Sequence, residues 1–255
     1  MFVTLPAGSA AGDGESRRLE LDATWTDFTR SNVSTPGTDG DPTIDADSLG
    51  IRRAVADAGR KMVEDGLVEG TAGNVSIRAG DMVAISPSSV PYDQVTEDSV
   101  CLLDLDGNVL RPSMTRPSSE TSMHLSVYRE TDAQAIVHHH GLSSVTVSTV
   151  LDELPPLHYY AVRLGGPVRV ARYERFGTPE LARSVLAALV DRTAALMQNH
   201  GAVAYGATLD EAYDRARLLE WLSALYIGAA ALGRPRVLSA DELAEVVKAR
   251  YERTT

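Results

Sequence analysis

The sequence predicts an α/β sandwich built around one mainly antiparallel sheet. Two stretches alternate apolar and polar residues on either side of a turn, at 73–89 and 99–113, as β-hairpins do. Segments with apolar residues at helical spacing precede them, follow them and lie between the later strands. No internal repeat interrupts this mixed order, so we expect one layered domain.

The helices are recognised by their spacing and by the residues that open them. The first is predicted over 47–68, with Ser48 as its N-cap. Further helices are predicted over 118–132, 177–192, 208–233 and 239–254. Thr178 caps one of them just before a proline, and Thr208 with Glu211 forms a capping box for the longest.

The strands are placed by alternation and by turn residues. The two hairpins are expected to turn around 79–81 and 106–108. A strand followed by a short helix is predicted at 135–150, and a strand pair over 194–206 with its turn near 199–201.

Composition limits the class of protein. The chain has 255 residues and a net charge of −11, which suits one core and argues against a nucleic-acid partner. No apolar run is long enough for a membrane helix, and the N-terminus lacks the pattern of a secretory signal. Cys101 is the only cysteine, which favours the reducing cytoplasm.

The chain is expected to divide into an arm and a domain. Residues 1–44 are rich in Gly, Ser, Thr, Asp and Pro and bury too little apolar surface to fold alone, so they are interpreted as a flexible arm. Residues 45–255 show no second change of composition and form the domain.

Three of the six histidines stand together in "AIVHHHG" at 135–141. Alternation along a strand places His138 and His140 on one face and His139 on the other. Two imidazoles on one face make a natural clamp for zinc, although an isolated pair is more often structural. His139 is expected to pack or to form hydrogen bonds.

Other polar residues permit more than one interpretation. His200, in "MQNHGAV", would complete an open three-nitrogen site of the catalytic kind. Glu120 is either a charge favoured at a helix N-terminus or an acid–base beside a metal. His124 lies one helical turn after Glu120, and it is a metal ligand or a structural histidine; His158 is equally open.

Three loops combine small residues with amides and hydroxyls: "GTAGNVS" at 70–76, "SPSS" at 86–89 and "RPSSE" at 116–120. Each alone is an ordinary turn. Together they are typical of loops that hold a phosphate dianion, and they would give an acidic chain a local positive potential.

Six segments occur in a fixed order: "GTAGNVSIR", "AISPSSVPYDQV", "RPSSETSMH", "IVHHHGLSS", "YERFGT" and "QNHGAVAYG". Their order and content resemble the class II aldolase/adducin family, most closely its L-fuculose-1-phosphate aldolase branch, over about residues 48–250. The resemblance implies an α/β/α sandwich around a mainly antiparallel sheet. It also implies a homotetramer with active sites between subunits.

The resemblance implies a role for particular residues. A zinc ion, or another divalent metal, is held by His138, His140 and His200, with Glu120 at the metal as proton shuttle. Tyr159, reaching in from a neighbouring subunit, is the acid at the aldehyde oxygen. The positions that match the family's phosphate site are Gly73, Asn74, Ser88, Ser89, Ser118 and Ser119.

The implied reaction is the reversible cleavage of a ketose-1-phosphate to dihydroxyacetone phosphate and an aldehyde, through a metal-stabilised enediolate. The small-molecule sugar phosphate is then the partner. Lys61 and Lys248 are the only lysines and lie outside the motifs, which argues against an imine-forming aldolase. Alternatives in the family are a sugar-phosphate 4-epimerase, a dehydratase, or a non-catalytic adducin-like module.

Some positions depart from the family pattern. His139 stands where asparagine is common, Ser89 replaces a glycine of the phosphate loop, and Asn199 replaces a histidine before His200. Tyr251 lies near the family's C-terminal tyrosine but does not match it. These departures bear on the aldehyde half of the substrate more than on the metal.

Overall fold

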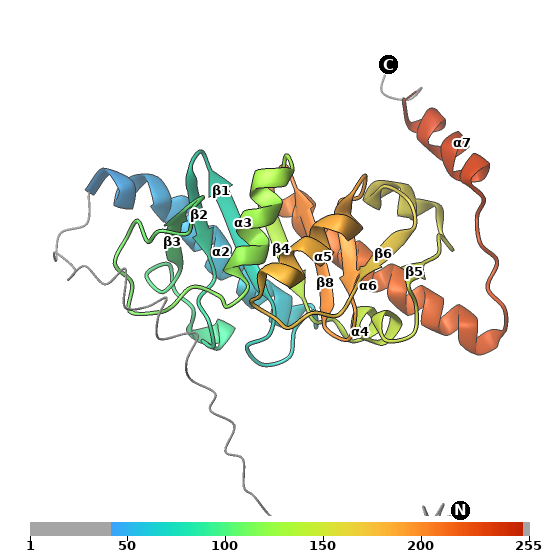
Figure 1. Ribbon diagram of the computed structural model, residues 1–255, viewed down its shortest axis with the longest axis horizontal. Helices are drawn as coiled ribbons and strands as arrows, with labels where there is room; N and C mark the ends of the chain where they lie inside the picture. The colour runs from blue at the N-terminus through green and yellow to red at the C-terminus, as the bar shows by residue number, and fades with distance from the viewer. Residues whose placement is uncertain (1–41, 252–255) are drawn as a thin grey trace, which may run out of the picture. The chain divides into compact units, whose positions relative to one another are not determined.

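A computed structural model describes residues 42–251 of the chain (Figure 1). The chain divides into two units between Thr38 and Asp39, and the described residues belong to the second. Nearly all of the predicted arm, residues 1–44, therefore lies outside the described residues.

A sheet of eight strands forms the centre of this unit, in the order β3-β2-β1-β4-β8-β7-β6-β5. The strands are β1 (Asn74–Ala79), β2 (Met82–Ile85), β3 (Cys101–Asp104), β4 (Ala135–His139), β5 (Glu153–Leu154), β6 (Val168–Ala171), β7 (Ala194–Met197) and β8 (Gly201–Gly206). All neighbours pair antiparallel except β6 and β7, which are parallel. The predicted mainly antiparallel sheet is confirmed.

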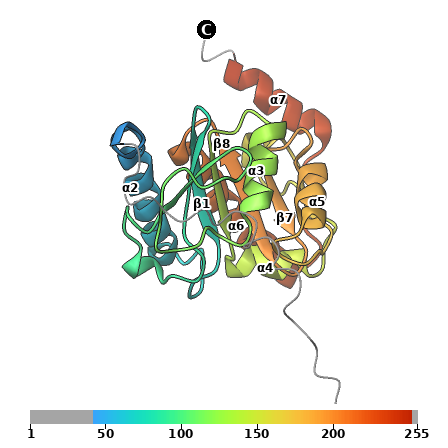
Figure 2. The same cartoon turned by 60° about the vertical axis from the view of Figure 1, so that its left-hand side comes forward.

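Helices cover both faces of this sheet. They are α2 (Pro42–Glu64), α3 (Thr121–Glu130), α4 (Leu142–Ser148), α5 (Pro179–Leu189) and α6 (Leu209–Leu232), with short 3-10 turns η1 (Tyr92–Gln94) and η2 (Tyr159–Leu164). The last helix, α7 (Ala240–Tyr251), packs against η2 and not on the sheet. Helices α3 and α5 lie side by side on one face (Figures 1 and 2). No helix within residues 42–251 is long and apolar enough to cross a membrane.

Strand alternation divides most buried apolar side chains between two large cores, and Ile85, Cys101 and Leu103 form a small third cluster. On β4, Val137 belongs to the core under α2 and α6, whereas Ile136 belongs to the core under α3 and α5. The same division separates Ala202 from Val203 on β8. Two layers of helix around one sheet confirm the α/β/α sandwich.

The predicted N-cap of the first helix is wrong. Helix α2 begins at Pro42, so Ser48 lies inside it, buried, where its hydroxyl accepts a hydrogen bond from Arg52 Nε at 3.2 Å. The start of α2 also takes in 42–44 from the end of the predicted arm. Ile44, near the start of α2, is partly buried and packs against the core, a long-range contact that local spacing does not reveal.

The second predicted hairpin has its turn but almost no return strand. The Asp104 carboxylate accepts hydrogen bonds from the backbone amides of Asp106 and Asn108, each at 2.8 Å. Beyond the turn, only an isolated bridge joins Leu103 to Val109. The chain then leaves the sheet toward the loop that precedes Glu120.

The later caps are confirmed, with one change of partner. Thr178 accepts from Leu181 N at 3.3 Å, and Thr208 accepts from Glu211 N at 3.2 Å. The Glu211 carboxylate accepts from Ala207 N at 2.9 Å, one residue before the cap. The short elements η1, η2, β5 and β6 were not predicted, because their few residues carry no clear period.

Candidate metal centre and active site

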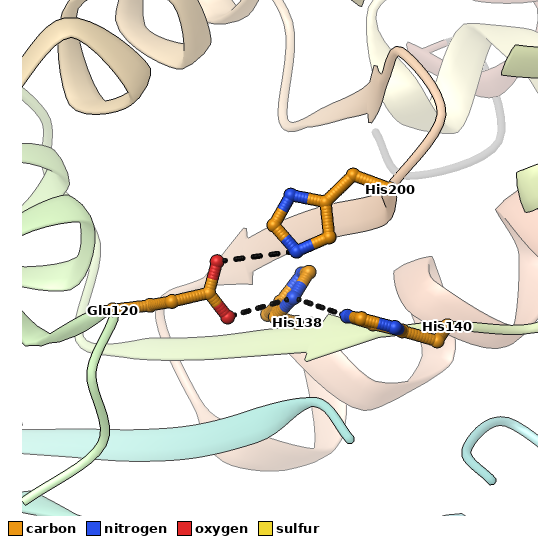
Figure 3. A group of neighbouring side chains, drawn as sticks. All are labelled: Glu120, His138, His140 and His200. Carbon is orange, nitrogen blue, oxygen red and sulfur yellow. Dashed lines mark hydrogen bonds and ion pairs between the residues drawn. The ribbon is translucent and has the colours of Figure 1, made fainter. Parts of the chain in front are cut away.

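Four side chains from distant parts of the sequence meet at one end of the central strands (Figure 3). They are Glu120, His138, His140 and His200, and their possible ligand atoms all lie within 4.8 Å of one another. His138 lies in β4, His140 just beyond it, His200 in the turn between β7 and β8, and Glu120 directly before α3. The four predicted ligands thus form one cluster.

The register of β4 brings these segments together. On one side Asn74 pairs with His138, and on the other Ala202 pairs with His139. The approach is close: a Cβ at Gly201 would lie 2.3 Å from the His139 carbonyl oxygen. A glycine at that position lets the β7–β8 turn place His200 beside the end of β4.

Hydrogen bonds define how the His138 ring faces the cluster. Its Nδ1 lies 2.9 Å from the Ala202 carbonyl oxygen, an acceptor, so Nδ1 carries a proton. Its Nε2 faces inward, 3.0 Å from Glu120 Oε2 and 2.9 Å from His140 Nε2. His200 Nε2 lies 3.3 Å from the other carboxylate oxygen, Oε1.

Burial and charge act against each other in this cluster. Burial alone would raise the pKa of Glu120, but His138 and His200 hold that pKa well below its usual range. Burial would lower the pKa of His138, but the Glu120 carboxylate outweighs it and raises that pKa. Burial, followed by repulsion from His138, lowers the pKa of His140 to about 3 and that of His200 to about 4. Both imidazoles are therefore neutral at pH 7, as metal ligands must be.

These residues fit a divalent metal. Three imidazole nitrogens and one carboxylate are donors that zinc and similar ions accept. Glu120 Oε1 is buried and receives no hydrogen bond from the described part of the chain. A buried carboxylate oxygen without a hydrogen bond is costly, and a bound cation would satisfy it.

The cluster opens into a cleft of about 390 Å³. All six residues matched to a phosphate site line it, together with Glu120, His140 and His200; those six are Gly73, Asn74, Ser88, Ser89, Ser118 and Ser119. The three loops singled out in the sequence therefore meet at one place. A larger hollow of about 590 Å³ beside α5 is lined by arginine and glutamate side chains and no histidine.

Backbone conformation explains part of this lining. Gly73 has φ +73°, and a Cβ there would lie 2.7 Å from the His138 carbonyl oxygen. Ser89 adopts φ 60°, a conformation that favours glycine. This is the position at which the resemblance implies a glycine. The Ser118 hydroxyl accepts from Glu120 N at 3.2 Å and so anchors the backbone of Glu120.

The other histidines lie outside the cluster. His139 is buried on the opposite face of β4, as alternation predicts, and its Nδ1 accepts from Gly141 N at 3.1 Å. His124 is fully buried, and both ring nitrogens contact side chains: Ser76 and Asn74. The structural interpretation of His124 is the one the contacts support. His158 caps η2 by accepting from Tyr160 N.

Tyr159 does not line this cleft within one chain. Its ring stacks on His158 with centroids 4.4 Å apart, and nearly half of the side chain is exposed. Thr71 and Phe176 line the cleft but were not singled out from the sequence. Phe176 lies in "YERFGT", where an aromatic residue before a Gly-Thr turn was an available signal.

An α/β/α sandwich whose antiparallel strands end in a three-histidine, one-carboxylate cluster, beside loops rich in serine and glycine, defines a class of metal-dependent enzymes. The family described as "Class II Aldolase and Adducin N-terminal domain" matches residues 53–227. The chain belongs to this class II aldolase and adducin family, and it is a class II aldolase.

Named relatives support this membership. The "5-deoxy-D-ribulose 1-phosphate aldolase" of Bacillus thuringiensis is 37% identical over 200 residues, which covers 77% of this chain and 93% of the relative. The "L-fuculose phosphate aldolase" of Escherichia coli K12 is 37% identical over 201 residues, covering 78% and 93%. A solved structure named "L-fuculose 1-phosphate aldolase" superposes with a TM-score of 0.75 at 32% identity, covering 80% of this chain and 96% of that one.

Proposed function

We propose that this chain is a zinc-dependent aldolase that reversibly cleaves a ketose-1-phosphate to dihydroxyacetone phosphate and an aldehyde. The observation that carries the proposal is the meeting of the four-residue cluster with the three serine- and glycine-rich loops in one cleft. The relatives, whose names give 5-deoxyribulose and fuculose phosphates as substrates, support the substrate class.

In this proposal His138, His140 and His200 hold the ion, with Glu120 beside it. When bound, a divalent cation polarises a substrate carbonyl and so acidifies the adjacent C–H bond. Nδ1 of His138 donates to the Ala202 carbonyl, so the inward-facing Nε2 is the nitrogen that would bind the ion. The low pKa values of His140 and His200 keep one ring nitrogen of each residue unprotonated at neutral pH.

Glu120 is proposed as the group that takes and returns the substrate proton. Its carboxylate is ionised, because the histidines hold its pKa low, and Ser118 anchors its backbone. Its Oε2 is engaged by Asn74 at 2.9 Å, whereas Oε1 receives no hydrogen bond from the described residues. A positioned carboxylate of this kind contributes about 10²- to 10⁴-fold to a proton-transfer step.

The phosphate group is proposed to lie against Gly73, Asn74, Ser88, Ser89, Ser118 and Ser119. Hydroxyls and turn amides bind a dianion without bringing a full positive charge into the cleft. This contact would fix the reacting carbon relative to Glu120.

Tyr159 is proposed to act from a neighbouring subunit of a homotetramer, as the acid at the aldehyde oxygen. Tyr159, Tyr160 and Trp221 are packed together and partly exposed. Exposed aromatic groups of this kind are typical of interfaces. We also propose a cytoplasmic location, from the single cysteine.

The proposal is tested with zinc-loaded protein and a panel of ketose-1-phosphates, in an assay coupled to dihydroxyacetone phosphate. We expect release of dihydroxyacetone phosphate from at least one substrate and none from metal-free protein. Consumption of a substrate without this product would identify the epimerase or dehydratase instead. Failure of the purified protein to bind about one metal ion per chain would overturn the proposal that it is a metal-dependent aldolase.

The assembly is tested by light scattering and by matched tyrosine variants. We expect a mass of four times 27.3 kDa. Tyr159→Phe should lower kcat, whereas Tyr160→Phe, the same change in the adjacent exposed ring, should not. Equal kcat values for the two variants would remove Tyr159 from the mechanism.

A further inference from the structure

A chain of buried polar side chains leads away from the metal cluster into the core beneath α3. It runs from Glu120 through Asn74, His124 and Ser76 to Tyr128. All five side chains are buried, and none of the last three lines the cleft. The metal and phosphate assignments do not explain why these groups should be joined.

The direction of each hydrogen bond in this series of side chains follows from the negative charge of the Glu120 carboxylate. An ionised carboxylate only accepts, so the Asn74 amide nitrogen donates to Glu120 Oε2 over 2.9 Å. The Asn74 carbonyl oxygen then faces His124, and Nε2 of His124 must donate to it. Both functional groups of this amide are therefore fixed by buried partners.

The same reasoning continues to the far end. Because His124 donates through Nε2 and is neutral, its Nδ1 accepts from the Ser76 hydroxyl over 2.7 Å. The Ser76 oxygen in turn accepts from the Tyr128 hydroxyl over 2.6 Å. Burial, followed by repulsion from His138, lowers the pKa of His124 to about 3, which agrees with a neutral ring.

We infer that Tyr128, Ser76, His124 and Asn74 act together as positioning residues that orient the Glu120 carboxylate. An amide does not pass a proton onward under ordinary conditions, so the chain orients the carboxylate and does not conduct protons. It engages Oε2 and leaves Oε1 as the oxygen without a hydrogen bond. Buried, fully paired networks of this kind hold a side chain in one geometry.

This inference rests on the proposed function and adds a second role for Asn74. An asparagine amide has two N–H donors, of which Glu120 uses one. The other donor can contact a phosphate oxygen. The positioning role predicts an effect on kcat and on the metal environment, whereas a phosphate contact alone would act on KM.

The test compares four zinc- or cobalt-loaded proteins: wild type, Asn74→Ala, Tyr128→Phe and Tyr213→Phe. Tyr213→Phe is the matched control, because Tyr213 is another buried tyrosine whose hydroxyl donates to Asp65, and it belongs to the core under α2 and α6. Tyr128 belongs to the other core. Visible absorption during titration of metal-free protein with Co²⁺ reports the ligand geometry. Steady-state kinetics with zinc use the ketose-1-phosphate that wild type cleaves best.

We expect Asn74→Ala to lower kcat by about 10- to 100-fold, the usual effect of losing an outer partner of a metal-site ligand. Its Co²⁺ spectrum should differ from that of wild type. Tyr128→Phe should lower kcat by about 2- to 10-fold, the equivalent of one net hydrogen bond, with KM little changed. Tyr213→Phe should match wild type in kcat and in the spectrum.

Two results would overturn the inference. One is a higher KM in Asn74→Ala with unchanged kcat and Co²⁺ spectrum, which would leave its amide with the phosphate role alone. The other is a Tyr128→Phe protein with the same kcat and the same Co²⁺ spectrum as Tyr213→Phe. This result would overturn the positioning role even if Asn74→Ala does not fold. If wild type cleaves no ketose-1-phosphate, the proposed function fails, and the Co²⁺ spectra still decide the positioning role.

Discussion

At the scale of single residues, the structure shows which of two predicted roles the Glu120 side chain has, a charge at a helix N-terminus or a member of the metal cluster. It occupies the N-cap position of α3, yet its side chain makes no capping bond. The Ser118 hydroxyl accepts from the Glu120 amide, and the carboxylate is turned toward the histidines and Asn74. The carboxylate therefore serves the cluster and not the helix end.

Replacing Glu120 by glutamine separates metal binding from proton transfer. We expect Glu120→Gln to keep about one metal per chain, because the histidines remain, and to lose at least about 100-fold in kcat, because an amide does not accept the substrate proton. Metal analysis and steady-state kinetics measure the two effects. The exposed Glu180→Gln is the control, and cleavage at the wild-type rate by Glu120→Gln would remove the assigned role.

His124 predicts a dependence of stability on pH. Burial lowers its pKa from 6.5 to about 3 in the folded chain. As the pH falls below 6.5, the unfolded chain binds a proton at this ring while the folded chain does not, so stability is lost between about pH 6.5 and pH 3. At pH 5 this contribution amounts to about 2 kcal/mol.

The measurement is urea unfolding of metal-free wild type and His124→Gln at pH 7.5 and pH 5. Wild type should lose more free energy of unfolding between the two pH values than His124→Gln does. The other histidines are present in both proteins, so their contributions to the change in unfolding free energy largely cancel from the comparison. An equal loss in the two proteins would show that His124 is not held neutral.

At the scale of elements, strand β4 carries most of the site. Its pairing with β1 places Asn74 opposite His138, and its pairing with β8 places Ala202 opposite His139. Helix α3 adds His124 and Tyr128 from above the same face. One strand register and one helix therefore set the positions of the ligands and of the chain of positioning residues together.

Gly201→Ala tests this register. The added methyl would lie 2.3 Å from the His139 carbonyl oxygen, a backbone atom, so β4 and β8 must separate. We expect a loss of about 1–3 kcal/mol in the free energy of unfolding and weaker metal binding. Gly50→Ala in α2 is the control, since it meets nothing within 4 Å and should be neutral or stabilising by up to about 1 kcal/mol. Wild-type stability and metal affinity in Gly201→Ala would contradict the close approach.

At the scale of the whole described unit, one sheet separates the two large cores. The site lies at the end of β4, where the segments that carry Glu120, His140 and His200 come together. His138 lies on the same face of β4 as Ile136, which belongs to the core of α3 and α5, whereas His139 lies on the opposite face, near Glu220. Because the cluster joins both halves of the sheet, occupancy by a metal should stabilise the fold and not only the site.

Metal removal tests this coupling. We expect zinc to raise the Tm of metal-free protein and a chelator to lower it again, with about 2.7 kcal/mol of stabilisation at a free metal concentration of 100 times Kd. The His140→Ala protein should bind no measurable metal, should be inactive and should show no zinc-dependent rise in Tm. Calorimetry with and without zinc measures the shift. A shift of equal size in His140→Ala would show that zinc acts elsewhere.

Local chemistry was readable from the sequence. Alternation separated His139 from His138 and His140, turn residues located the β1–β2 and β7–β8 connections, and Thr178 and Thr208 were recognised as caps. These features depend on neighbours a few residues away, so the pattern contains the information that determines them. The order of six motifs added the family, which local spacing does not contain.

Only the tertiary structure decided the partners of buried groups. The sequence left Ser48 as a cap, left His124 between ligand and structural residue, and did not suggest that Asn74 joins His124 to Glu120. Those outcomes depend on which segments the sheet places side by side, over separations of about fifty residues in the last two cases. By itself the sequence determined the residue types and the faces of the strands and helices on which they lie. The packing of β1, β4, β8 and α3 decided which of these residues meet. The physical reason is that a buried polar group must form its hydrogen bonds with whatever partner the fold places beside it.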